Sequence, residues 1–123
     1  MEESPFKGQR GVRRLLNAVR YSVQGFASAY RHEEAFRQEV ALALLLGAAA
    51  LFVHVTGFER ALMLTSVMLV LVVELLNSAI EAAVDRVSLE NHRLAKRAKD
   101  IGSAAVFVAL ANVVMVWGAI LAG

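Results

Sequence analysis

The sequence contains no cysteine and only one proline, one tryptophan and two tyrosines among its 123 residues. Without cysteine the chain can form no disulfide framework and no zinc–thiolate site, and it has no thiol nucleophile. It also lacks the glycine-rich phosphate-binding loops that mark soluble nucleotide-binding enzymes. The first 30 residues hold no continuous apolar core, so we expect no cleavable signal peptide.

Apolar residues are abundant. They make up 58% of the chain, and the mean hydropathy is +0.55. Soluble domains contain about 45–50% apolar residues, and a chain this short could not hide such an excess in its own core. The composition therefore predicts an integral membrane protein.

Three apolar segments account for most of this excess, at residues 40–57, 61–84 and 101–122. The first has 18 residues, which at ~1.5 Å per residue nearly matches a hydrocarbon core of ~30 Å. We expect three membrane-spanning helices in a single membrane domain, 1–123, with a short turn at residues 57–60.

The segment before them, residues 7–31, alternates basic and apolar side chains at helical spacing. A basic amphipathic helix is typical of a segment that lies on an anionic membrane surface. The predicted fold class is thus all-α: one amphipathic surface helix and three membrane spans.

Lysine and arginine are distributed unevenly around these segments. Seven fall before residue 40 and five between residues 85 and 100, whereas Arg60 alone lies in the first hairpin loop. Positively charged loops stay in the cytoplasm. We therefore expect a cytoplasmic N-terminus and a C-terminus on the outer side.

The second span carries a polar stripe near its cytoplasmic end. Its members, which share one helix face about 100° wide, are Glu74, Asn77, Ser78, Glu81 and Asp85. A purely structural role, in which the stripe hydrogen-bonds neighbouring helices, would be served by one asparagine or serine. Three carboxylates do not suit that role, because they repel each other unless a cation lies among them. Acids inside a membrane helix are costly and mark functional sites by default.

The chemistry of this stripe indicates phosphoryl transfer. Carboxylates without cysteine suit Mg²⁺, which proteins hold with one or two carboxylates plus substrate phosphates. Lys99 and Arg14 could balance the remaining phosphate charge. Glu74 lies one or two turns deeper than Glu81, where a desolvated carboxylate suits a general base acting on a lipid hydroxyl.

Three segments carry a resemblance to a known family. They are residues 34–39 (EAFRQE), 74–86 (ELLNSAIEAAVDR) and 98–105 (AKDIGSAA). In these, and over nearly the whole chain from about Arg14, the sequence resembles the small bacterial integral-membrane diacylglycerol kinases. The resemblance implies a homotrimer in the bacterial inner membrane that uses MgATP to convert diacylglycerol into phosphatidic acid, with membrane lipids around it and no nucleic-acid partner.

The resemblance also implies roles for single residues. Glu74 would accept the proton with Asn77 beside it, and Glu33 and Glu81 would bind the metal ion; the chemistry alone does not separate Glu33 from Glu34. Contacts to ATP would come from Arg14, Tyr21, Glu33, Glu81, Asp85, Glu90, Asn91, His92, Lys99 and Asp100. Contacts to the lipid substrate would come from Ala18, Ser22, Val23, Ala27, Tyr30, Ala35, Gln38, Glu39, Phe52, Val55, Arg60, Glu74, Ser103, Trp117 and Ala122.

Two alternatives stay open at this stage. A related undecaprenol kinase would share the central block and differ in its lipid. A small cation channel or transporter would also carry acids within a span, but it should have polar residues along the full depth, and the outer half of the second span offers only Thr65 and Ser66.

Overall fold

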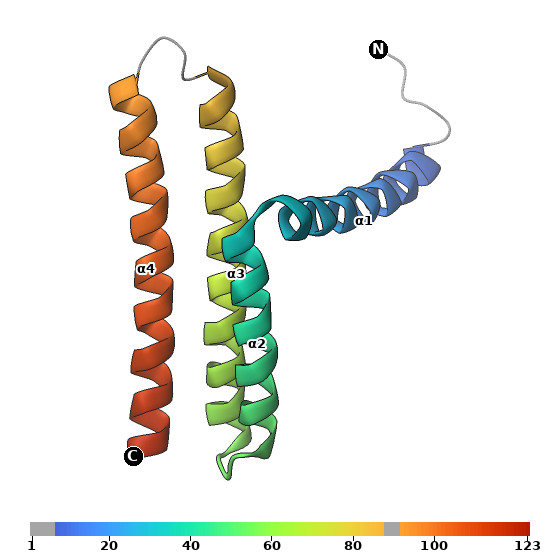
Figure 1. The fold of residues 1–123 in the computed structure, drawn as a ribbon. Coiled ribbons are helices and arrows are strands. Elements are labelled where there is room, and N and C mark those ends of the chain that lie inside the picture. Colours follow the sequence, from blue (N-terminus) through green and yellow to red (C-terminus); the bar gives the residue numbers. More distant parts are fainter. Residues whose placement is uncertain (1–6, 88–91) are drawn as a thin grey trace.

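A computed structural model describes residues 7–87 and 92–123 of the chain. Within these ranges the chain forms four helices: α1 (Lys7–His32), α2 (Glu34–Phe52), α3 (Gly57–Val87) and α4 (His92–Ala122). Helices α2, α3 and α4 run alongside one another, and α1 extends sideways from the start of α2 (Figure 1). The central helix is α3, because it packs against both α2 and α4.

Helices α2, α3 and α4 are each long and apolar enough to cross a membrane. This confirms the expectation of three apolar spans. The 31 residues of α3 and of α4 exceed the ~20 that a bilayer needs, so their charged ends extend past the apolar part. Large apolar side chains such as Phe107 and Val114 remain exposed on the outer faces, as lipid-facing residues would be.

The predicted turn at residues 57–60 is wrong. Helix α2 ends at Phe52, the connection occupies residues 53–56, and α3 already begins at Gly57. The reason is a capping box. The backbone N–H of Glu59 donates to Oγ1 of Thr56 at 3.1 Å, and the backbone N–H of Thr56 donates to Oε1 of Glu59 at 2.9 Å.

Arg60 completes this connection. Its guanidinium donates to the carbonyl oxygens of Ala50, Val53 and Val55. Carbonyls in the last turn of a helix, such as that of Ala50, have no N–H partner further along the helix. One side chain from α3 therefore caps α2 and holds the loop between them.

The connection between α1 and α2 is a single residue, Glu33, with an extended backbone (φ −115°, ψ 108°). Its N–H donates to the Ala29 carbonyl of α1 and its carbonyl accepts from the N–H of Arg37 in α2. The Arg37 guanidinium reaches back to the carbonyls of Tyr30 at 2.8 Å and Arg31 at 3.2 Å. This elbow fixes the place where the Glu33 side chain leaves the backbone.

Near the C-terminal end of α4, Trp117 links this helix to α3 by hydrogen bonds. Its indole N–H donates to Oγ of Ser66 at 3.2 Å and to the carbonyl of Met63 at 3.3 Å. Met63 and Ser66 are buried on α3, as are Val67 and Val70. The core of the chain thus follows one face of α3.

Candidate functional site

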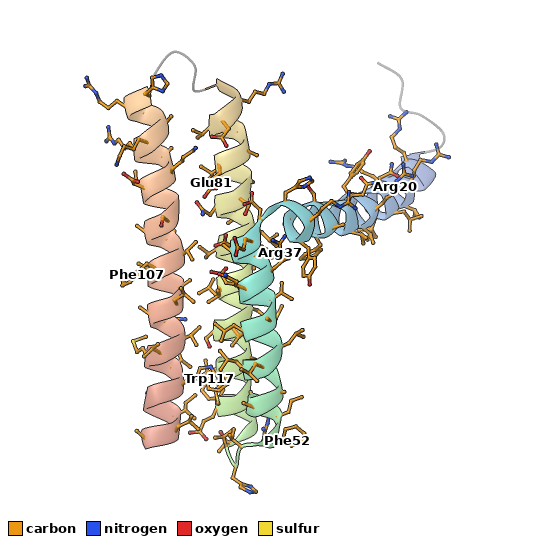
Figure 2. The ribbon with its side chains drawn as sticks, in the orientation of Figure 1. Arg20, Arg37, Phe52, Glu81, Phe107 and Trp117 are labelled. Atoms are coloured by element: carbon orange, nitrogen blue, oxygen red, sulfur yellow. The ribbon has the colours of Figure 1, made fainter. Side chains whose placement is uncertain are left out.

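The polar stripe of α3 changes from buried to exposed along the helix. Glu74 and Asn77 have only 5% and 7% of their surface exposed, Ser78 and Glu81 are half-buried, and Asp85 is exposed. Figure 2 shows Glu81 on the part of α3 that leads to its C-terminal end. Glu74 is therefore the most buried member of the stripe, and burial decreases toward the C-terminal end of α3.

Asn77 and Glu81 are joined by a hydrogen bond. The Nδ2 atom of Asn77 donates to Oε1 of Glu81 at 3.0 Å, one helical turn further along α3. The Oδ1 atom of Asn77 is buried and accepts no hydrogen bond from the described residues. Asn77 therefore orients the Glu81 carboxylate through one half of its carboxamide and leaves the other half unpaired.

A second carboxyl faces Glu74 from α2. The carboxyl groups of Glu39 and Glu74 interact, and the charges of Glu33 and Glu81 also act on Glu74. The Oε2 atom of Glu39 is buried without a hydrogen-bond partner among the described residues. Carboxyl groups that interact in this way require a proton or a cation to offset their mutual repulsion.

A cavity of about 570 Å³ opens beside this cluster, between α1 and α3. Its polar lining includes Ser22, Ser28 and His32 of α1, Glu33 of the elbow and Ser78 of α3, and its remaining wall is apolar. The Glu33 side chain makes no cap hydrogen bond to α2, so its carboxylate is available to the cavity. Glu33 and the α3 stripe therefore share one opening.

Two ion pairs lie at the open end of the stripe. Nζ of Lys99 on α4 lies 2.6 Å from Oδ1 of Asp85 on α3. Nζ of Lys96 lies 2.7 Å from Oδ2 of Asp100, within α4 itself. The structure thus brings Lys99 to the stripe, whereas the Asp100 carboxylate is engaged with its own helix.

The other predicted nucleotide contacts lie further out. Arg14 and Tyr21 are exposed on α1, and Arg14 precedes the first cavity residue, Ser22, by about two helical turns. His92 is exposed at the start of α4. Glu90 and Asn91 lie outside the described residues.

The predicted lipid contacts fall in different parts of the molecule. Those in the N-terminal part lie along α1 from its middle onward and in the first turns of α2: Ala18, Ser22, Val23, Ala27, Tyr30, Ala35, Gln38 and Glu39; Ser103 is exposed on α4. Those near the α2–α3 connection or the C-terminal end of α4 are Phe52, Val55, Arg60, Trp117 and Ala122. Figure 2 shows Phe52 and Trp117 toward the end of the bundle opposite to Glu81.

Two features of the site were missed in the sequence. The carboxyl of Glu39 faces Glu74, whereas the resemblance gave it only a lipid contact. Gly102 is buried on α4 against the Asn77 side chain. A glycine inside a helical segment is itself a signal of close packing, and this one lies within the 98–105 block.

The residues present fit a magnesium ion held together with a nucleotide. No group of three or more histidine, aspartate or glutamate side chains within 7–87 and 92–123 forms a ready metal cage. One or two carboxylates with phosphate oxygens is the usual arrangement for Mg²⁺, and the half-buried Glu33 and Glu81 can supply those carboxylates.

Comparison with known proteins places the chain in a family. The family model described as prokaryotic diacylglycerol kinase matches residues 20–121. A diacylglycerol kinase of Pseudomonas aeruginosa is 57% identical over 123 residues, which cover 100% of both chains. Those of Haemophilus influenzae and Escherichia coli K12 are 50% and 48% identical, over 90% and 87% of this chain and 94% and 88% of theirs. The resemblance of the three sequence blocks is therefore confirmed, and the chain belongs to the prokaryotic diacylglycerol kinase family.

Proposed function

We propose that this protein phosphorylates diacylglycerol to phosphatidic acid with ATP as the phosphoryl donor. The observation that carries the proposal is the nearly buried Glu74 carboxyl, which faces Glu39 and lies one turn from the Asn77–Glu81 pair. The relatives named diacylglycerol kinase, which match the chain over most of its length, support the choice of substrate.

The proposed reaction is a direct transfer. The oxygen of the lipid hydroxyl attacks the γ-phosphorus of ATP, a new phosphorus–oxygen bond forms, and the bond to the ADP oxygen breaks. The Glu74 carboxylate takes the proton that leaves the hydroxyl. Its burial keeps water away from the attacking position, so the lipid rather than water is phosphorylated.

Glu33 and Glu81 would hold the Mg²⁺ that accompanies ATP. When bound, such an ion neutralises charge on the transferring phosphoryl group. Asn77 keeps the Glu81 carboxylate in one orientation, and the elbow fixes the origin of the Glu33 side chain. Lys99, which the structure brings to the stripe beside Asp85, would balance phosphate charge together with Arg14. Asp85, Asp100 and Tyr21 are assigned to the nucleotide by family resemblance alone.

The proposal includes the place and assembly of the protein. The N-terminus, α1 and the α3–α4 connection would lie on the cytoplasmic side of a bacterial inner membrane, with α1 on the surface, as the lysine and arginine distribution predicts. We propose a homotrimer. One chain leaves the cavity between α1 and α3 open at its side, and a neighbouring chain could enclose a lipid and a nucleotide there.

The deciding experiment is a kinase assay on purified protein in mixed micelles with MgATP and either diacylglycerol or undecaprenol as acceptor. Transfer to diacylglycerol is expected, and preferential transfer to undecaprenol would contradict the proposed substrate. Glu74→Gln should lower kcat by about 10²–10⁴-fold, the usual contribution of a general base. Glu59→Gln, an acid in the capping box at the other end of α3, should stay within twofold of wild type. Near-wild-type turnover of Glu74→Gln would remove the base assignment.

A further inference from the structure

Gly102 lies where α4 comes closest to the site. It is a buried residue of α4 and faces the Asn77 side chain of α3. The three heavy atoms nearest to a Cβ placed on Gly102 all belong to Asn77. The closest is Oδ1, which such a Cβ would overlap, followed by Cγ at 3.1 Å and Cβ at 3.9 Å.

The closest contacts of this position are made by one side chain of α3. A glycine that only allows two helices to approach would bring its Cα against the backbone or several side chains of its neighbour. Here the three heavy atoms nearest to a methyl group would all belong to the Asn77 side chain, and the two closest to its carboxamide. What Gly102 provides is therefore room for the Oδ1 half of that carboxamide.

The two halves of a carboxamide cannot move independently, because the group is planar. Oδ1 lies over Gly102 while Nδ2 donates to Oε1 of Glu81. Any group at residue 102 that pushes Oδ1 aside must rotate Nδ2 as well. The Asn77 side chain is buried, and within residues 7–87 and 92–123 its Oδ1 has no hydrogen-bond partner that could compensate for the rotation.

We infer that Gly102 is a positioning residue: the absence of its side chain sets the orientation of the Asn77 carboxamide and, through it, of the Glu81 carboxylate. The structural part of this inference stands alone, and its catalytic consequence rests on the proposed function. Gly102 touches neither substrate nor reacting atoms in this role; it acts through Asn77.

The structural part is tested by NMR on protein labelled with [¹⁵N]asparagine in detergent micelles. The chain has four asparagines, and the Asn77 carboxamide signals are identified by their loss in Asn77→Ala. Gly102→Ala should shift the Asn77 signals and leave those of Asn17 unchanged. Gly47→Ala, a matched helical glycine with open space around its Cβ position, should shift neither. Unchanged Asn77 signals in Gly102→Ala would overturn the inference.

Should Gly102→Ala fail to fold, the double variant Asn77→Ala/Gly102→Ala decides the matter. A folded double variant supports the inference, because removing the carboxamide removes the collision. A double variant that also fails to fold would overturn it, because Gly102 would then be required for another contact.

The catalytic part is tested with MgATP. Gly102→Ala should raise the KM for MgATP about tenfold, the size expected for losing one hydrogen bond to a charged group, while kcat falls less than KM rises. The KM of Gly47→Ala should remain within twofold of the wild-type value.

Shifted Asn77 signals with an unchanged KM would overturn the link to Glu81. A wild-type protein that binds MgATP but does not phosphorylate diacylglycerol would count against the proposed function alone; MgATP affinity then replaces KM in the comparison.

Discussion

Lys99 of α4 and Asp85 of α3 form an ion pair between helices, with 2.6 Å between Nζ and Oδ1. Both side chains are well exposed, at 44% and 63%, and exposed ion pairs contribute about 0–1 kcal/mol to stability. The pair therefore contributes little to stability, and its main effect is to position the Lys99 ammonium group. Asp85 holds a cation at the open end of the polar stripe, within the electrostatic range of Glu81.

Lys99→Gln should raise the KM for MgATP by about tenfold and change the free energy of unfolding by less than ~1 kcal/mol. Steady-state kinetics and unfolding in detergent measure the two effects. Lys96→Gln is the matched control, since Lys96 forms its ion pair with Asp100 inside α4 and not with α3. If Lys99→Gln instead lost stability with unchanged kinetics, the pair would be a structural link.

Glu33 and Glu34 can be separated by their positions. Glu33 lies at the elbow, lines the cavity with Ser78 and acts on Glu74, whereas Glu34 is exposed in the first turn of α2. Glu33→Gln should raise the Mg²⁺ concentration for half-maximal activity about tenfold, as expected for losing one charged ligand. Glu34→Gln should stay within twofold. The reverse pattern in an Mg²⁺ titration at fixed ATP would transfer the ligand role to Glu34.

Arg60 should act mainly through stability. Its guanidinium satisfies carbonyls of Ala50, Val53 and Val55, so Arg60→Ala should lower the free energy of unfolding by about 1.5–3 kcal/mol. Arg60→Lys should recover only part of this loss, because an ammonium group lacks the planar fork of donors. Hydrogen exchange at residues 53–56 locates the effect, and Arg20→Ala on exposed α1 is the control. An unchanged stability with a raised KM for lipid would support the lipid contact that the family resemblance implies.

Trp117 should couple energetically to Ser66. Trp117→Phe keeps an aromatic ring but loses the indole N–H, which should cost about 1 kcal/mol of stability. In a double-mutant cycle with Ser66→Ala, the two effects should be non-additive by about 0.5 kcal/mol or more. Phe107→Leu, an exposed position on the same helix, serves as the control. Additive effects would show that the hydrogen bond does not contribute.

The helical class and the apolar spans followed from composition and periodicity, because a short chain with so much apolar surface has no other place for it than lipid. The helix boundaries were predicted less accurately from the sequence. Thr56 and Glu59 form a capping box whose pattern is written in the sequence, but a run of glycine and charged residues suggested a turn there instead.

The sequence by itself placed Glu74, Asn77, Glu81 and Asp85 on one face, since helical spacing alone decides which side chains of one helix share a side. Only the tertiary structure decided what each of them meets: Glu39 opposite Glu74, Lys99 beside Asp85, and Gly102 beneath the Asn77 carboxamide. These partners come from other helices, and a contact between helices depends on their relative rotation and depth, which local periodicity does not specify.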